Sequence, residues 1–151
     1  MLFQRINRSD PEKIFLVVYN SYSTAALTNG QAVNWDFVTD ADGVSVTRPL
    51  ARATNGGIAI AGVAAEGIAV GAYGLIQVYG YHSAVRVRAI TAGSPAITAG
   101  RPLVANAVGS LFCLESITTG STHLQVAQVG FALAGWSSWT TSTIAAFLKC
   151  L

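Results

Sequence analysis

The side chains that could perform acid–base or metal chemistry are few in this chain and widely spaced. Its two histidines, His82 and His123, have no second histidine, cysteine or acid at a spacing typical of zinc ligands. The carboxylates stand in turns or alone, as Glu66 and Glu115 do, whereas a glycosidase needs two facing carboxyl groups. We therefore expect no metal site and no catalytic acid pair.

Motifs that build other kinds of active site are also missing. The sequence contains no G-x-S-x-G, no G-x-G-x-x-G and no phosphate-binding G-x-x-x-x-G-K-[ST]. Cys113 and Cys150 are far apart and form no C-x-x-C pair. Isolated cysteines of this kind usually behave as small buried hydrophobes, so we favour that interpretation over a disulfide. We expect no enzymatic activity and no cofactor.

Two pairs of residues are candidates for contact with a partner. Trp136 and Trp139 lie three apart in the polar stretch "GWSSWTTST". Tryptophan is enriched at interface hot spots and also fills cores, so this pair is either a contact patch or a plug for one barrel end. Arg86 and Arg88 share one face of a strand, where they meet either a carboxylate-rich neighbour, a glycan or solvent alone.

Composition places these residues in an unusually apolar chain. Its 151 residues amount to one domain, with 52% hydrophobic and only 11% charged residues. Because contiguous apolar surface usually marks an interaction site, so few charges favour burial between subunits. The net charge is only +2, and the sequence has no cluster of lysine or arginine. We therefore expect no direct binding of nucleic acid.

The N-terminal residues differ from the rest of the chain. Residues 1–13 show no hydrophobic periodicity, so we expect an arm that becomes ordered on a partner. Residues 14–151 are expected to form one β-barrel domain. The start lacks the apolar core of about 7–15 residues that a signal peptide needs, so we expect assembly in a cytoplasm.

The segment "GIAVGAYGLIQVYGYHSAV", residues 67–85, has no Asp, Glu, Lys or Arg and raises the question of a membrane span. Its many glycines and its Val, Ile and Tyr residues favour strands over a membrane helix, and no basic cluster flanks it. We expect a strand at Leu75–Tyr81 that is buried on both faces. After a bend at Gly80–Ser83, alternation places Val85, Val87 and Ala89 inward and Arg86 and Arg88 outward.

No segment shows a sustained helical stripe, whereas short apolar runs recur between Gly- and Pro-containing turns. In "QAVNWDF", alternation places Val33, Trp35 and Phe37 on one face and Asn34 and Asp36 on the other. The turns "TAGSP" and "TAGRP" are similar but too short to form a repeat. About ten short strands indicate an all-β fold, a single compact barrel. Strands are expected within residues 14–19, 31–37, 44–46, 58–64, 103–114, 123–135 and 144–151, and turns at 40–43, 54–57, 91–95, 98–102 and 107–110.

Several stretches together resemble the capsid decoration, or cement, proteins of tailed bacteriophages. The resemblance implies a tulip-like β-barrel without an active site, clustered in homotrimers on the outer surface of the phage head. It implies the major capsid protein and further copies of the chain as partners, with no membrane, and stabilisation of the shell against packaged DNA. The stretches are residues 29–50 ("NGQAVNWDFVTDADGVSVTRPL"), 57–87, 97–111 ("ITAGRPLVANAVGSL") and 129–135 ("VGFALAG").

Candidate contacts with the capsid or with other subunits come from the arm, the arginine pair and the tryptophan pair. Two other functions stay open: another virion component, such as a tail-tube, connector or fibre-base barrel, and a carbohydrate-binding module that stacks sugars on the tryptophans. The candidate residues are Leu2, Phe3, Arg5, Arg8, Arg86, Arg88, Trp136 and Trp139.

Overall fold

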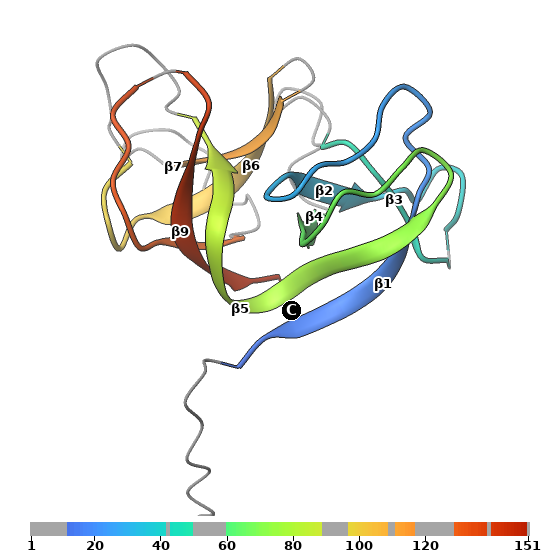
Figure 1. Ribbon diagram of the computed structural model, residues 1–151, viewed down its shortest axis with the longest axis horizontal. Helices are drawn as coiled ribbons and strands as arrows, with labels where there is room; N and C mark the ends of the chain where they lie inside the picture. Colours follow the sequence, from blue (N-terminus) through green and yellow to red (C-terminus); the bar gives the residue numbers. More distant parts are fainter. Residues whose placement is uncertain are drawn as a thin grey trace, which may run out of the picture.

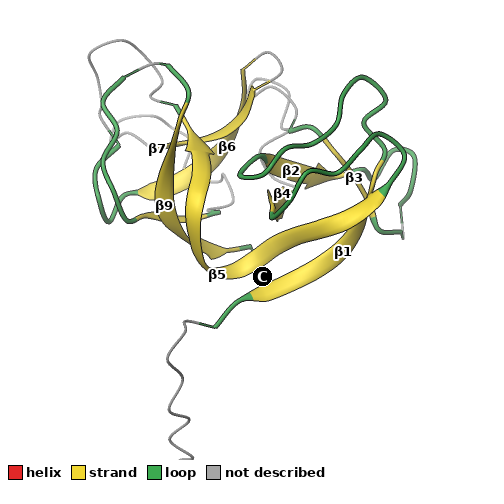
Figure 2. Cartoon of the chain, in the orientation of Figure 1, coloured by secondary structure: helices red, strands yellow, loops and turns green. Residues whose placement is uncertain are grey.

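The structure is a computed structural model of the chain, and it describes most of the sequence beyond the arm. All of the secondary structure in the described part is β-strand and turn, with no helix, as Figure 2 shows. The prediction of an all-β barrel fold is confirmed. No helix of the described part is long and apolar enough to span a membrane. The described residues are 12–41, 43–49, 60–88, 97–108, 111–116, 129–138 and 140–150, with the side chains of 105–108 and 111–116 left aside.

Nine strands make up one continuous hydrogen-bonded sheet. The fifth strand is by far the longest and bends across the whole molecule (Figure 1). The strands are β1 Ile14–Asn20, β2 Ala32–Trp35, β3 Ser45–Thr47, β4 Ile60–Ala64, β5 Tyr73–Val87, β6 Pro102–Val108, β7 Leu111–Ser116, β8 Gly130–Ala132 and β9 Ser142–Lys149.

The sheet closes on itself twice, and both closures use β5. Strands β1, β3, β2, β4 and the first half of β5 form a first ring, which the β1–β5 pairing closes. The second half of β5 joins β7, β6, β8 and β9 in a second ring, which the β5–β9 pairing closes. The barrel is therefore a pair of five-stranded rings that share one strand, as the two lobes of Figure 1 show.

The two rings have the same topology, strand for strand. Each contains one parallel pair, β1–β3 or β5–β7, and four antiparallel pairs in the same order. The registers agree as well. Corresponding pairs are Val33–Gly62 with Leu103–Gly130, Ala64–Ile76 with Ala132–Ala146, Tyr19–Tyr73 with Arg86–Thr143, and the isolated bridges Leu27–Ile68 with Ile97–Trp136.

The chain thus contains one structural unit twice, which sequence analysis did not predict. Few identical residues mark the repeat, apart from "LTNG" at 27–30 and "ITAG" at 97–100. The glycines that end these turns, Gly30 and Gly100, have nearly the same φ, +82° and +83°. This left-handed backbone conformation is easy for glycine and costly for other residues, so glycine ends both turns although the sequences around them differ.

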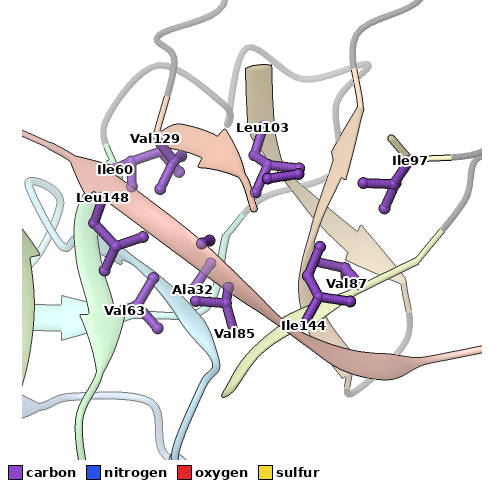
Figure 3. Close-up of a cluster of buried hydrophobic side chains, with 12 residues drawn as sticks. Ala32, Ile60, Val63, Val85, Val87, Ile97, Leu103, Val129, Ile144 and Leu148 are labelled. Atoms are coloured by element: carbon purple, nitrogen blue, oxygen red, sulfur yellow. The ribbon is translucent and has the colours of Figure 1, made fainter. Parts of the chain in front are cut away.

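Each ring encloses its own hydrophobic cluster. The first ring surrounds a cluster that includes Val18, Val33 and Ile76. The second surrounds Val85, Ile144 and Leu148, and the side chains of Ala32, Ile60 and Val63 pack against these from β2 and β4 (Figure 3). Strand β4 is buried along its whole length because one face lines the first cluster while the other lines the second.

Strand β5 serves both clusters because it turns over between its two halves. Val78 points into the first ring, and Val85 and Val87 point into the second, each with at most 1% of its surface exposed. Gly80 lies at the bend with φ +96°, and the register shifts between His82 and Val85. The predicted bend and the inward positions of both valines are confirmed, whereas Ala89 lies outside the described residues.

Two predictions about strand faces are wrong. Leu75 is 38% exposed, so the stretch Leu75–Tyr81 is not buried on both faces: the outer side of the first ring faces solvent there. The alternation predicted to place Phe37 on the same face as Val33 fails, because β2 ends at Trp35 and Phe37 is exposed. Asn34 lies on the opposite face from Val33 and is buried too, because β2 lies between the two clusters. Within the expected strand at 123–135, the described part forms only the short strand β8.

Candidate interaction surface

Large apolar side chains gather on the outer side of four neighbouring strands, β1, β5, β9 and β8. Val17 lies directly opposite Leu75 on the β1–β5 ladder, and these side chains are 59% and 38% exposed. Tyr19 lies opposite Tyr73, which is 67% exposed, and their rings are 5.2 Å apart. These positions point away from the first cluster, because the alternating residues Val18 and Ile76 point into it.

The apolar surface continues from the first ring onto the second. Ile14 pairs with Tyr79 on the ladder, and the Tyr79 ring meets the edge of the Phe147 ring at 5.2 Å. Phe147 in turn lies opposite Phe131, which is 39% exposed. We call this surface the outer apolar face. It comprises Ile14, Phe15, Val17, Tyr19, Tyr73, Leu75, Tyr79, Phe131 and Phe147.

The charged residues within these four strands are basic. Lys149 pairs with Tyr79, and Arg86 is outward on the second half of β5. Lys13, just before β1, holds its ammonium group 5.9 Å from the centre of the Tyr81 ring. Acidic groups lie in the flanking segments: Glu12 precedes Lys13, and the Glu66 carboxylate accepts the backbone N–H of Leu75 at 2.9 Å. The border of the outer apolar face is therefore basic at Lys13 and Lys149, near Tyr79, and acidic at Glu66, beside Leu75.

A small polar pocket opens beside this face, at the junction of the rings. It has a volume of about 190 Å³, and its walls include Lys13, Asn29, Gln77 and His82. Gln77 is buried and donates its amide hydrogens to backbone carbonyls of β5. The His82 ring is 7% exposed, and its Nδ1 accepts the backbone N–H of Ala84 at 3.2 Å. Gln77 and His82 thus form hydrogen bonds with the backbone of β5 at its bend, which is a structural role.

His82 makes the stability of the fold depend on pH. Burial lowers the pKa of His82 below its usual value of 6.5, a hydrogen bond to the backbone of Ala64 opposes that effect, and the charge of Lys13 adds to it. The unfolded chain therefore takes up a proton at a higher pH than the folded chain. The stabilisation is complete above pH 6.5 and is lost as the pH falls below that value.

We expect the free energy of unfolding to fall as the pH drops below 6.5, in total by about 1.4 kcal/mol for each unit by which the pKa is lowered. Urea unfolding at a series of pH values measures this decline. In His82→Gln the decline over this range should be smaller than in the wild type. An identical pH dependence in both proteins contradicts the assignment.

Among the described residues, the remaining titratable groups lie apart or are engaged locally. In the part of the chain that the structure describes, no three His, Cys, Asp or Glu side chains come together as metal ligands. The pKa of Asp36 is lowered by a hydrogen bond from Thr39 and, to a smaller extent, by one from Ser21, while burial acts in the opposite direction. This carboxylate is therefore engaged by hydrogen bonds from nearby side chains. Burial raises the pKa of Cys150 to about 12, so its thiol stays protonated at neutral pH.

The structure leaves most of the predicted contact residues apart from the outer apolar face. Trp136 is half-buried against the second cluster and donates its indole N–H to the carbonyl of Thr140 at 2.9 Å. Arg86 and Arg88 are half-buried at the end of β5, where Arg86 lies opposite Thr143. Four predicted contacts in the arm and one tryptophan lie outside the described residues: Leu2, Phe3, Arg5, Arg8 and Trp139.

Sequence reasoning missed the outer apolar face itself. Its members lie in "IFLVVYN" and "YGLIQVY", which are apolar at nearly every position. Such runs are typical of strands buried on both sides, and alternation alone does not reveal that one side faces solvent. The available signal was the aromatic content, because Phe15, Tyr19, Tyr73 and Tyr79 all fall at outward positions.

No protein-family model matches this chain, and no curated protein matches it either. Among solved structures, the chain is similar to the head fiber gp8.5 N base in bacteriophage phi29, with 14% sequence identity and a TM-score of 0.49. The match covers 93% of this chain and 98% of that chain. A TM-score at this level does not establish a common fold, and the identity does not establish a common function.

Proposed function

We propose that this chain is a structural protein of a tailed-phage virion, a capsid decoration protein that binds the outside of the head and stabilises it. The outer apolar face carries the proposal. Large contiguous apolar patches on a folded protein mark interaction sites. Among the described residues, six of the eleven exposed large hydrophobic residues belong to this face. The sequence resemblance to decoration proteins supplies the kind of partner, the major capsid protein.

The fold suits a purely mechanical role. A protein that binds the assembled shell more tightly than its separated subunits shifts the equilibrium towards the shell by its binding free energy. Two rings that share β5 form one rigid unit, so little conformational entropy is lost when it docks. We propose assembly as homotrimers, because three linked contacts raise the overall affinity well above that of one.

The test uses heads of the phage that encodes this chain, produced without it. Purified protein should bind these heads in co-sedimentation, raise the temperature at which they release DNA and protect them against osmotic shock. Heads that already carry the protein serve as the control, because their sites are filled. Absence of binding, or binding without any gain in stability, contradicts a decoration role.

Position on the particle separates this role from other virion roles. Labelled protein should appear over the whole head surface in electron micrographs. Label confined to the tail, the connector or the base of a fibre would assign the chain to those structures instead. A carbohydrate-binding role receives little support, since Trp136 packs against the second cluster and has committed its indole N–H.

A further inference from the structure

We infer that the outer apolar face is the surface that docks on the shell, and that it recognises an apolar patch of the shell protein bordered by carboxylates. This inference rests on the proposed function and adds to it the face used and the chemistry of the partner surface. Three observations carry it: a comparison between the two rings, the charges at the border of the face, and the size of the face.

The second ring shows which outward side chains are compatible with this fold. The partners Tyr19 and Tyr73 of the first ring correspond to Arg86 and Thr143 of the second, because both pairs occupy the same place on equivalent ladders. The next outward positions along each strand correspond in the same way. Val17 and Leu75 have as counterparts Ala84 and Ala145.

At these four positions, the first ring is therefore apolar and aromatic where the second ring is small or polar. Since both rings have the same topology and register, folding does not require large apolar side chains there. In the first ring, these side chains expose apolar area to water, which is unfavourable. A docking partner that covers the area removes it from water. The difference between the rings points to binding as the reason for these residues.

The charges at the border of the face select the chemistry of the partner. Lys149 is paired with Tyr79 and Lys13 lies over the Tyr81 ring, so both lysines carry positive charge at the Tyr79 end of the face, whereas the Glu66 carboxylate lies beside Leu75. A surface with an apolar centre and with Asp or Glu opposite the two lysines would complement both parts. Complementary rim charges mainly speed association and set its orientation, while the apolar centre slows dissociation.

The size of the face sets how tightly one copy holds. Four strands spaced about 4.8 Å apart, over about six residues of β5, give a footprint on the order of 400 Å². That is at the small end of specific interfaces, which usually cover about 800 Å² per partner. A single copy should therefore bind weakly, and retention on the shell would depend on several linked copies.

The experiment exchanges residues between the rings. The variant Val17→Ala, Tyr73→Thr, Leu75→Ala places second-ring side chains on the first ring, where the shared fold accommodates them. It should bind protein-free heads at least about tenfold more weakly than the wild type, a loss of about 1.4 kcal/mol. A second variant, Lys13→Glu with Lys149→Glu, should slow association and weaken its salt dependence. Val38→Ala, on an exposed turn outside these four strands, is the matched control and should bind normally.

Thermal unfolding of each variant first establishes that it is folded. If the wild type and all variants bind heads equally, the inference is overturned while the decoration role stands. If the wild type binds no heads, both fail. Binding of the wild type to anionic phosphatidylglycerol vesicles in place of heads would assign the face to a lipid surface and overturn a protein partner.

Discussion

Replacing Gly30 with alanine is expected to lower the free energy of unfolding by about 3 kcal/mol. Gly30 lies where the first ring meets the second half of β5: its N–H donates to Ala64, and its carbonyl accepts the N–H of Arg86 at 2.9 Å. A Cβ atom at this position would lie 2.2 Å from the carbonyl oxygen of Ala84, which is backbone and cannot swing away. The positive φ of +82° adds strain for any residue other than glycine.

Gly100 provides the control within the same molecule. It is the equivalent turn glycine of the second ring, its φ is +83°, and no heavy atom lies within 4 Å of a Cβ built there. Gly100→Ala should therefore cost only the backbone strain, about 1 kcal/mol. Urea unfolding of both variants measures how much more free energy of unfolding is lost in Gly30→Ala. That difference is the cost of the close contact with the carbonyl oxygen of Ala84. Equal losses in the two variants contradict this explanation.

Truncating a core side chain in either ring should destabilise the whole chain by about 2–5 kcal/mol in a single transition. Ile76 is fully buried in the first cluster, and Leu148 is fully buried in the second. The clusters share β5 and the two buried faces of β4, so neither ring can open without exposing the core of the other. Ile76→Ala and Leu148→Ala should each shift one common unfolding curve.

Calorimetry and circular dichroism on the same samples measure this cooperativity, since coincident transitions indicate two-state unfolding. Leu75→Ala is the control for Ile76→Ala, because its side chain is 38% exposed on the neighbouring position and should cost less. Two separate transitions, with Ile76→Ala moving one and Leu148→Ala the other, would show that the rings unfold independently.

Several features followed directly from the sequence. Alternation in "VRV" placed Val85 and Val87 in the core and Arg86 outside, because a strand sends successive side chains to opposite faces. The glycine at position 80 marked the bend of β5, since glycine readily takes the positive φ found there. Composition and turn residues predicted an all-β fold without helices, which the described part confirms.

The closure into two rings was decided only in three dimensions. It depends on pairings between strands far apart in the chain, such as Val17 with Leu75 and Tyr81 with Phe147, and no local pattern records them. The repeat was hidden for the same reason. Backbone hydrogen bonds define the topology and the register, and they are compatible with most side chains. Corresponding positions such as Asn20 and Val87 therefore carry unrelated residues.

What the sequence determined by itself was the local structure: strands, turns, the bend and the inward side of the alternating stretch at residues 85–87. These depend on the conformational preferences of single residues and their near neighbours. Which uninterrupted apolar run is buried on both sides, and which presents one side to solvent, depends on what packs above it. Strand β4 has the second ring against its outer side, whereas Val17 on β1 and Tyr73 and Leu75 on β5 are exposed to solvent. The outer apolar face therefore exists only as a consequence of how the two rings pack.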